Sequence, residues 1–191
     1  MRKIPAFWFL IGGIAVVILW LISSYNGFVS SKGFVENGWA QVETQYQRRL
    51  DLIPNLVSTV KGAANFEQET FRAVTEARSA WSQSKSIADR TGQIQAASQF
   101  DSALSRLLVT VEAYPQLQAT QAFRDLMTQL EGTENRVAVA RKDYNEAVIA
   151  YNVRTRRFPG LLAAKLFGFL PEATFDADPE AEKAPSVDFT K

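Results

Sequence analysis

Residues 4–25 read IPAFWFLIGGIAVVILWLISSY, a stretch without a charged residue that sets the plan of the whole chain. At about 1.5 Å per residue it forms a helix of roughly 33 Å, enough to cross a hydrocarbon core of about 30 Å. Trp8, Trp20 and Tyr25 lie toward its two ends, where aromatic rings favour the headgroup level. A cleaved signal peptide would have a shorter apolar region and a small-residue cleavage site. We therefore expect a retained transmembrane helix.

The charges on either side of this stretch bear on its orientation. Arg2 and Lys3 belong to a basic N-terminus, residues 1–3, whereas Lys32 and Glu36 follow the stretch. The positive-inside rule then favours a cytoplasmic N-terminus and places the rest of the chain outside the cytoplasm. We expect a single-pass protein of the cell membrane, with the lipid bilayer as its first partner.

Residues 35–171 carry three apolar stripes with steps of three and four residues or their sums. The first stripe comprises Val35, Trp39, Val42, Tyr46, Ile53, Leu56, Val60, Ala64, Phe71, Val74 and Trp81; the second runs from Ile94 to Val111 and the third from Phe123 to Tyr151. Such spacing is typical of amphipathic helices, and no stretch alternates with period two. The sequence predicts an all-α fold: an elongated antiparallel bundle of three long helices and a short C-terminal helix.

Three further segments complete this plan. Residues 26–34 contain Gly27 and Gly33 and are expected to form a hinge between the anchor and the bundle. Pro54 interrupts the first stripe, and a kinked continuous helix is favoured over a new helix that starts at Pro54 with a poor N-cap. Residues 172–191 are acidic and contain proline, which predicts a mobile tail.

The lengths of the predicted helices suggest an assembly. The first and third span about 60 to 75 Å and the second only about 35 to 40 Å. One short helix leaves part of both long stripes uncovered. We therefore expect a homo-oligomer or a contact with another membrane protein to bury the remainder.

The apolar segment 161–170, LLAAKLFGFL, leaves two interpretations open. It follows Arg154, Arg156 and Arg157. One interpretation is a short helix docked on the bundle. The other is an interfacial segment that touches lipid, with the arginines on anionic headgroups, and this second interpretation allows membrane remodelling as a function.

The composition excludes several kinds of chemistry. The 191 residues include no Cys and no His, so thiolate nucleophiles, Cys-based zinc sites and imidazole bases are absent. The net charge of +1 and the lack of a basic stripe argue against nucleic acid as a partner. We expect no cofactor and no metal. The enzyme that stays possible is a carboxylate-dependent one, with Asp51, Glu67 or Glu134 as candidates.

Polar residues within the stripes are the other candidates for function. Arg49, Arg78, Glu134 and Arg141 lie at or beside stripe positions, where they either pair across the bundle or lean out to solvent. Two Tyr-Asn pairs also recur at a spacing of seven, which puts both rings on one helix face and both amides on the next. These pairs are Tyr144-Asn145 and Tyr151-Asn152. A packed seam with polar edges is the simplest interpretation of this repeat.

Residues 48–62, RRLDLIPNLVSTVKG, resemble the signature of the LemA family. The signature positions that we single out are Arg48, Arg49, Asp51, Pro54, Asn55 and Lys61. Later pieces follow in the family's order: Ala77-Arg78, Tyr114-Pro115, Glu134-Asn135, Ala140-Arg141, the two Tyr-Asn pairs, Phe158-Pro159 and Gly168-Phe169. The resemblance covers about residues 5 to 175.

The resemblance implies a bacterial membrane protein with a long helical bundle and no established enzymatic activity. Family members are often treated as scaffold or envelope proteins, and the domain is sometimes placed in the cytoplasm, against the charge rule. The hypothesis favoured here is a non-catalytic scaffold that binds itself or a membrane partner. A carboxylate-dependent enzyme and a membrane-remodelling protein are the alternatives.

Overall fold

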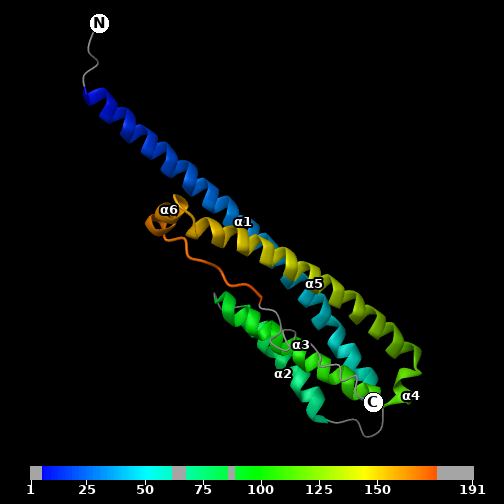
Figure 1. The fold of residues 1–191 in the computed structure, drawn as a ribbon. Helices are drawn as coiled ribbons and strands as arrows, with labels where there is room; N and C mark the ends of the chain where they lie inside the picture. Colours follow the sequence, from blue (N-terminus) through cyan, green and yellow to red (C-terminus); the bar gives the residue numbers. More distant parts are fainter. Residues whose placement is uncertain (1–5, 62–67, 86–88, 176–191) are drawn as a thin grey trace, which may run out of the picture.

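The computed structural model describes residues 6–61, 68–85 and 89–175, and over these ranges it is helical without a strand. The helices, in chain order, are α1 (Ala6–Lys61), α2 (Gln68–Ser84), α3 (Arg90–Glu112), α4 (Pro115–Gln118), α5 (Gln121–Arg156) and α6 (Gly160–Phe167). The predicted all-α bundle is confirmed. The apolar N-terminal part of α1 projects alone beyond the other helices (Figure 1).

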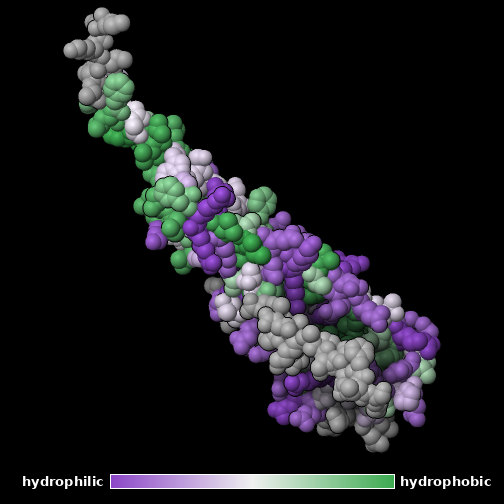
Figure 2. Space-filling view, in the orientation of Figure 1, coloured by the Kyte–Doolittle hydropathy of each residue, from purple (hydrophilic) through white to green (hydrophobic). Residues whose placement is uncertain are grey.

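The apolar part of α1 is long and apolar enough to cross a membrane, and no residue of its most apolar stretch is buried inside the structure. Figure 2 shows it as a hydrophobic rod that leads into the rest of the structure, which has a mainly hydrophilic surface. We call this rest, formed by the remainder of α1 and by α2 to α6, the body. The helix runs through residues 26–34 without a break, so the segment expected to act as a hinge is helical in this structure. A helix tolerates isolated glycines at a cost of about 1 kcal/mol each, and packing of Phe28 and Val35 offsets that cost.

Pro54 lies inside α1, as the continuous-helix interpretation predicts. Its ring removes one hydrogen bond to the carbonyl of Leu50, but the neighbours Ile53 and Leu56 are buried on the core side. Pro54 itself faces solvent. Burial of the flanking apolar side chains therefore holds the helix through the proline.

The long first helix expected to reach Trp81 ends at Lys61, and this prediction is wrong. In one continuous helix Tyr46 and Trp81 would be about 50 Å apart, whereas their ring centroids are 4.7 Å apart. Helix α2 runs back along α1 and pairs with α3 (Figure 1). The apolar stripe continues in phase across both helices, so periodicity alone does not reveal the reversal.

The body therefore consists of two antiparallel helix pairs, α1 with α5 and α2 with α3. Large aromatic rings join the pairs: Trp81 contacts Trp39 at 6.2 Å and Tyr46 at 4.7 Å between centroids, and Phe100 lies 6.3 Å from Tyr46. Edge and tilted ring contacts of this kind add stabilisation beyond the buried area. Gly38 lets α1 and α5 approach closely, because a Cβ there would lie 3.1 Å from the Tyr144 Cα.

The arrangement of two helix pairs also contradicts the expectation that one short helix would leave part of the long apolar stripes uncovered. Stripe residues Val35, Val42, Leu56 and Val60 are all fully buried within one chain. The second helix pair covers the stripe that was expected to overhang. Self-association stays a prediction, but it no longer follows from an uncovered stripe in the body.

The remaining helix ends follow local signals. Asp89 caps α3 by accepting hydrogen bonds from the backbone N–H of Thr91 and Gly92, at 3.0 and 3.2 Å. Thr120 caps α5 in the same way, and Pro115 occupies the first turn of α4. Gly168 ends α6 with a φ of 75°, a left-handed conformation that favours glycine.

Candidate functional site

Five side chains from three helices meet inside the body and form what we call the polar junction. They are Tyr46 and Arg49 of α1, Asp101 of α3, and Glu134 and Arg141 of α5. Each of the three helices contributes an apolar stripe beside these residues, which brings the polar groups to the same level. The junction thus ties the two helix pairs together.

Asp101 is the centre of the junction. Its Oδ1 accepts a hydrogen bond from Arg49 Nη1 at 2.8 Å, and its Oδ2 accepts one from the Tyr46 hydroxyl at 2.7 Å. Arg141 Nη2 also pairs with Oδ2 and with the Tyr46 hydroxyl. Both carboxylate oxygens are therefore occupied, and the carboxylate faces two arginines.

Arg49 is the most deeply buried charge of the junction, with a side chain only 4% exposed. Its second nitrogen, Nη2, pairs with Glu134, whose side chain is 62% exposed. A buried guanidinium needs such partners, because an unpaired buried charge costs several kcal/mol. Glu134 thus reaches in from the surface to complete the neutralisation of Arg49.

Tyr46 supplies the neutral member of the junction. Burial raises the pKa of Tyr46 well above its ordinary value, and the negative charge of Asp101 raises it further. The hydroxyl therefore stays protonated and acts as a hydrogen-bond donor. In the sequence Tyr46 fits a position of the first apolar stripe, and that spacing does not predict its polar contacts.

A second polar arrangement, the tail clamp, consists of Tyr144, Asn145 and Asn152 of α5 with residues 172–175. Asn152 Nδ2 donates to the Glu172 carbonyl at 2.8 Å, and its Oδ1 accepts from the Glu172 N–H at 2.9 Å. Asn145 makes the same pair of bonds with Phe175, at 3.0 and 2.9 Å. Each amide side chain thus satisfies one backbone donor and one backbone acceptor of the segment.

The spacing of the two asparagines matches the segment that they bind. Seven residues of helix rise about 10.5 Å, and three residues of extended chain span about 10 Å. Asn152 and Asn145 therefore align with Glu172 and Phe175 while the segment runs antiparallel to α5. The hydroxyl of Tyr144, the residue before Asn145, donates to the carbonyl of Ala173, which lies between Glu172 and Phe175, at 2.7 Å. The repeat at a spacing of seven has a structural reason.

Phe175 anchors the end of this segment in the core and links the clamp to the junction. Its ring stacks on Trp39 at 5.8 Å and meets Tyr144 edge-on at the same distance. The guanidinium of Arg141 lies 4.6 Å from the Phe175 ring centre. Residues 172–175 are therefore packed against the bundle, which corrects the prediction of a mobile tail for these four residues. Residues 176–191 lie outside the described ranges.

The two tyrosines of the repeat are not equivalent. Burial raises the pKa of Tyr144 to about 12. Burial also raises the pKa of Tyr151, with a further contribution from the charge of Glu172. The Tyr151 ring packs edge-on against Phe28, and its buried hydroxyl has no hydrogen-bond partner among the described residues.

The other predicted site residues lie away from both arrangements. Arg48, Asp51, Pro54 and Asn55 face solvent on α1, and Asn135 does so on α5. Asp51 accepts a hydrogen bond from Gln47 at 2.9 Å.

Three further predicted residues complete the set. Arg78 on α2 is half-buried, and no ion pair joins it to another described residue. Lys61 is the last residue of α1, and Glu67 lies outside the described ranges. Within the signature, Arg49 thus joins the junction and Arg48, Asp51, Pro54 and Asn55 face solvent. The apolar signature residues Leu50, Ile53, Leu56 and Val60 are buried in the core.

Asp101 is the functional residue that sequence analysis missed. It lies four residues after Ala97 and three before Leu104, so it occupies a stripe position of the second helix. A charge at such a position is the signal that could have identified it. Among the described residues, no group of three or more acidic side chains is arranged to hold a metal ion.

Comparison with known proteins places this architecture in a family. The model of the LemA family matches residues 38–189. The chain is 28% identical to the magnetosome protein MamQ 2 of Paramagnetospirillum magneticum over 192 residues, covering 88% of this chain and 71% of that protein. It is 24% identical to the protein LemA of Metamycoplasma hominis over 133 residues, covering 70% and 60% of the two chains. The chain therefore belongs to the LemA family.

Proposed function

We propose that this protein is a membrane-anchored helical scaffold without catalytic activity, which acts by binding a second copy or another membrane protein. The apolar part of α1 supplies the anchor, and the basic N-terminus favours a body outside the cytoplasm. Relatives named as magnetosome proteins support a role associated with a membrane.

The observation that carries the non-catalytic part is the pairing of the carboxylates in the polar junction. General acid–base catalysis by a carboxylate requires a group that is free to exchange a proton with a substrate. Asp101 instead accepts hydrogen bonds from Arg49 and Tyr46 and pairs with Arg141, and Glu134 pairs with Arg49. Asp51 is exposed on a helix face. This pattern is typical of a structural ion-pair network, which disfavours the carboxylate-enzyme alternative.

Exposed apolar side chains on α5 offer a surface for the proposed contacts. Ile149 and Val153 are one helical turn apart and are 55% and 51% exposed. Together with Asn152, Arg156 and Arg157 they line a surface groove of about 470 Å³. The surface lies at the end of α5 nearest the anchor, where a partner held in the same membrane would reach it. Confinement to one membrane also raises the effective concentration of such partners.

Site-specific photocrosslinking in native membranes tests this proposal. A benzophenone amino acid placed at Ile149 is expected to give adducts that contain a second copy or an integral membrane protein. The matched control is the same group at Arg72, an exposed position on α2 at the other helix pair. Equal adduct yield at both positions, or none at either, would contradict the proposal. A compartment reporter fused after Lys191 tests the orientation independently.

A further inference from the structure

Helix α6 packs against α1 at the level where the apolar part of α1 ends. The Tyr25 ring contacts the rings of Phe167 and Phe169, with centroids 5.1 and 5.8 Å apart. Tyrosine at the end of an apolar span marks the headgroup region of a bilayer. The end of α6 therefore lies at the depth where the anchor leaves the membrane.

One side chain of α6 reaches past that level toward the anchor. Phe167, together with Ile18, Leu21, Ile22 and Tyr25, lines an apolar groove of about 320 Å³. Ile18 lies about 10 Å farther along α1 than Tyr25, on the side of the hydrocarbon core. Phe167 thus faces a part of α1 that is membrane-embedded if the anchor spans the bilayer.

The face of α6 turned away from the body is apolar. Ala163 and Ala164 are buried against the other helices, and the bulky residues lie on the opposite side. Leu162 and Leu166 of α6 are more than half exposed, and so are Phe158 and Leu170, which flank the helix at its two ends. Leu162 and Leu166 are four residues apart within α6 and therefore share one helix face. In Figure 2 a hydrophobic patch lies at the place that α6 occupies in Figure 1, next to the pale surface at the end of the anchor.

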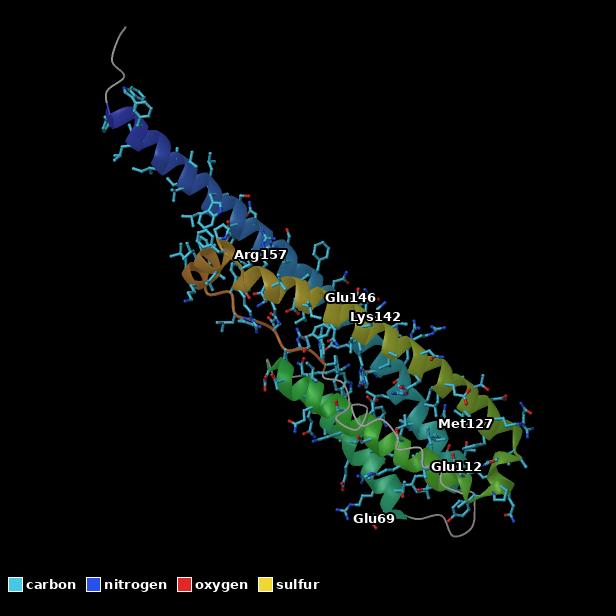
Figure 3. All side chains as sticks on the ribbon, viewed as in Figure 1. Glu69, Glu112, Met127, Lys142, Glu146 and Arg157 are labelled. Carbon is cyan, nitrogen blue, oxygen red and sulfur yellow. The ribbon has the colours of Figure 1, made fainter. Side chains whose placement is uncertain are left out.

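Basic side chains border this apolar face. Arg156, Arg157 and Lys165 are exposed, and Figure 3 shows Arg157 where α5 meets α6. Arg154 differs from these three residues because its side chain is engaged within the protein: it donates to the Gly27 carbonyl at 2.8 Å and covers the Phe28 ring. An apolar helix face with a basic border is the pattern of segments that lie in the interface of an anionic membrane.

We infer that α6 is a second membrane contact: Phe158, Leu162, Leu166 and Leu170 enter the acyl region, and Arg156, Arg157 and Lys165 bind anionic lipid headgroups. The bilayer, rather than a protein, is the occupant, because the apolar face is continuous with the anchor and begins at its headgroup end. This inference rests on the membrane anchoring proposed above. It means that the body is fixed to the membrane at two points and cannot swing freely on α1.

Depth-dependent quenching in the full-length protein tests this inference. Because the chain has no cysteine, Leu166→Cys gives a single site for an environment-sensitive fluorophore. The labelled protein is reconstituted into vesicles of phosphatidylcholine and phosphatidylglycerol whose acyl chains carry a nitroxide quencher. Leu10→Cys in the anchor and Val109→Cys on α3 are the matched controls, since both side chains are similarly exposed. Circular dichroism verifies that each variant is folded.

Quenching at position 166 is expected to exceed that at 109 by at least about threefold and to approach that at 10. Strong quenching at 10 with none at 166 would overturn the inference and leave the anchor intact. A label at 166 that reports an apolar surrounding without quenching would indicate a protein partner on α6 and would also overturn it. Absence of quenching at both 10 and 166 would contradict the anchoring itself.

The basic border is tested with the same label. The double change Arg156→Gln and Arg157→Gln is expected to lower quenching at 166 in vesicles with phosphatidylglycerol by about twofold. The control, Lys142→Gln, alters an exposed charge farther along α5 and is expected to leave quenching unchanged (Figure 3). An identical response of both variants would exclude headgroup binding by the two arginines.

Discussion

The polar junction and the tail clamp hold the body together by different physical means. The junction joins three helices through charges around Asp101, and the guanidinium of Arg49 within it is only 4% exposed. The clamp joins a helix to an extended segment through neutral amides, each of which pairs with one backbone N–H and one C=O. Removing a partner therefore leaves a buried charge in one case and an unpaired backbone dipole in the other.

This difference determines how far a defect spreads. A buried charge without a partner destabilises the whole fold, because solvent must enter the core to reach it. A backbone segment that loses its hydrogen bonds can detach locally, since residues 172–174 are partly exposed and can regain water. We expect the junction to control global stability and the clamp to control the attachment of the tail. Arg141 contacts both and couples them.

The largest effect is expected from Asp101→Ala. The change leaves Arg49 and Arg141 without their shared carboxylate and lowers the free energy of unfolding by about 3 to 5 kcal/mol. Denaturant unfolding of the full chain in mild detergent, followed by circular dichroism, measures it. Asp51→Ala removes an exposed carboxylate from α1 and serves as the control. An equal loss of unfolding free energy in both variants would show that Asp101 stabilises the fold no more than an exposed carboxylate does.

A smaller, local effect is expected from Asn152→Leu. The substitution removes both hydrogen bonds to Glu172, which together contribute about 2 kcal/mol to the attachment of the segment. Amide hydrogen exchange of residues 172–175 should accelerate, while exchange in the core of α5 should stay unchanged. Asn135→Leu, an exposed position on the same helix, is the control. Faster exchange throughout the bundle would contradict a local role for the clamp.

The clamp also predicts a response to alkaline pH. The pKa of Tyr144 is raised to about 12, so the folded state favours the protonated hydroxyl. This contribution is complete below the unfolded pKa of about 10 and is lost as the pH rises through the folded value. Stability should therefore fall between about pH 10 and 12, and Tyr144→Phe should reduce that slope while costing about 1 kcal/mol at neutral pH. An unchanged slope would mean that other tyrosines account for it.

The smallest effect is expected where an ion pair lies outside both arrangements. Arg72 pairs with Glu76 at 2.6 Å on the exposed face of α2. Water and salt screen such a pair, so Glu76→Gln should leave the denaturation midpoint unchanged within error. A loss comparable with that of Asp101→Ala would show that charge pairing as such, rather than burial, stabilises this protein.

The two arrangements differ in how much of them could be read from the sequence. The asparagine repeat was visible as a spacing of seven, but its partner was not, since residues 172–175 lie 20 to 30 positions downstream. Arg49, Glu134 and Arg141 were visible as polar residues near stripes. Asp101, which joins them, was not identified, because a charge at a stripe position does not by itself show which residues of other helices it meets.

The reversal after Lys61 was missed for a related reason. Gly62 follows directly, and a glycine after the last periodic residue is an ordinary helix-stop signal. The stripe continues in phase to Trp81, however, and that continuity favoured a single helix. The ring contact between Tyr46 and Trp81 decides the matter.

The sequence by itself determined the all-α class, the apolar anchor, most helix boundaries and the face that each helix buries. These features follow from the helical period and from end signals, which act over a few residues. Only the tertiary structure decided that α2 turns back on α1, that Asp101 gathers two arginines, and that the asparagines hold the tail. Each of those contacts joins residues tens of positions apart, and the period of a stripe does not specify which stripe it packs against.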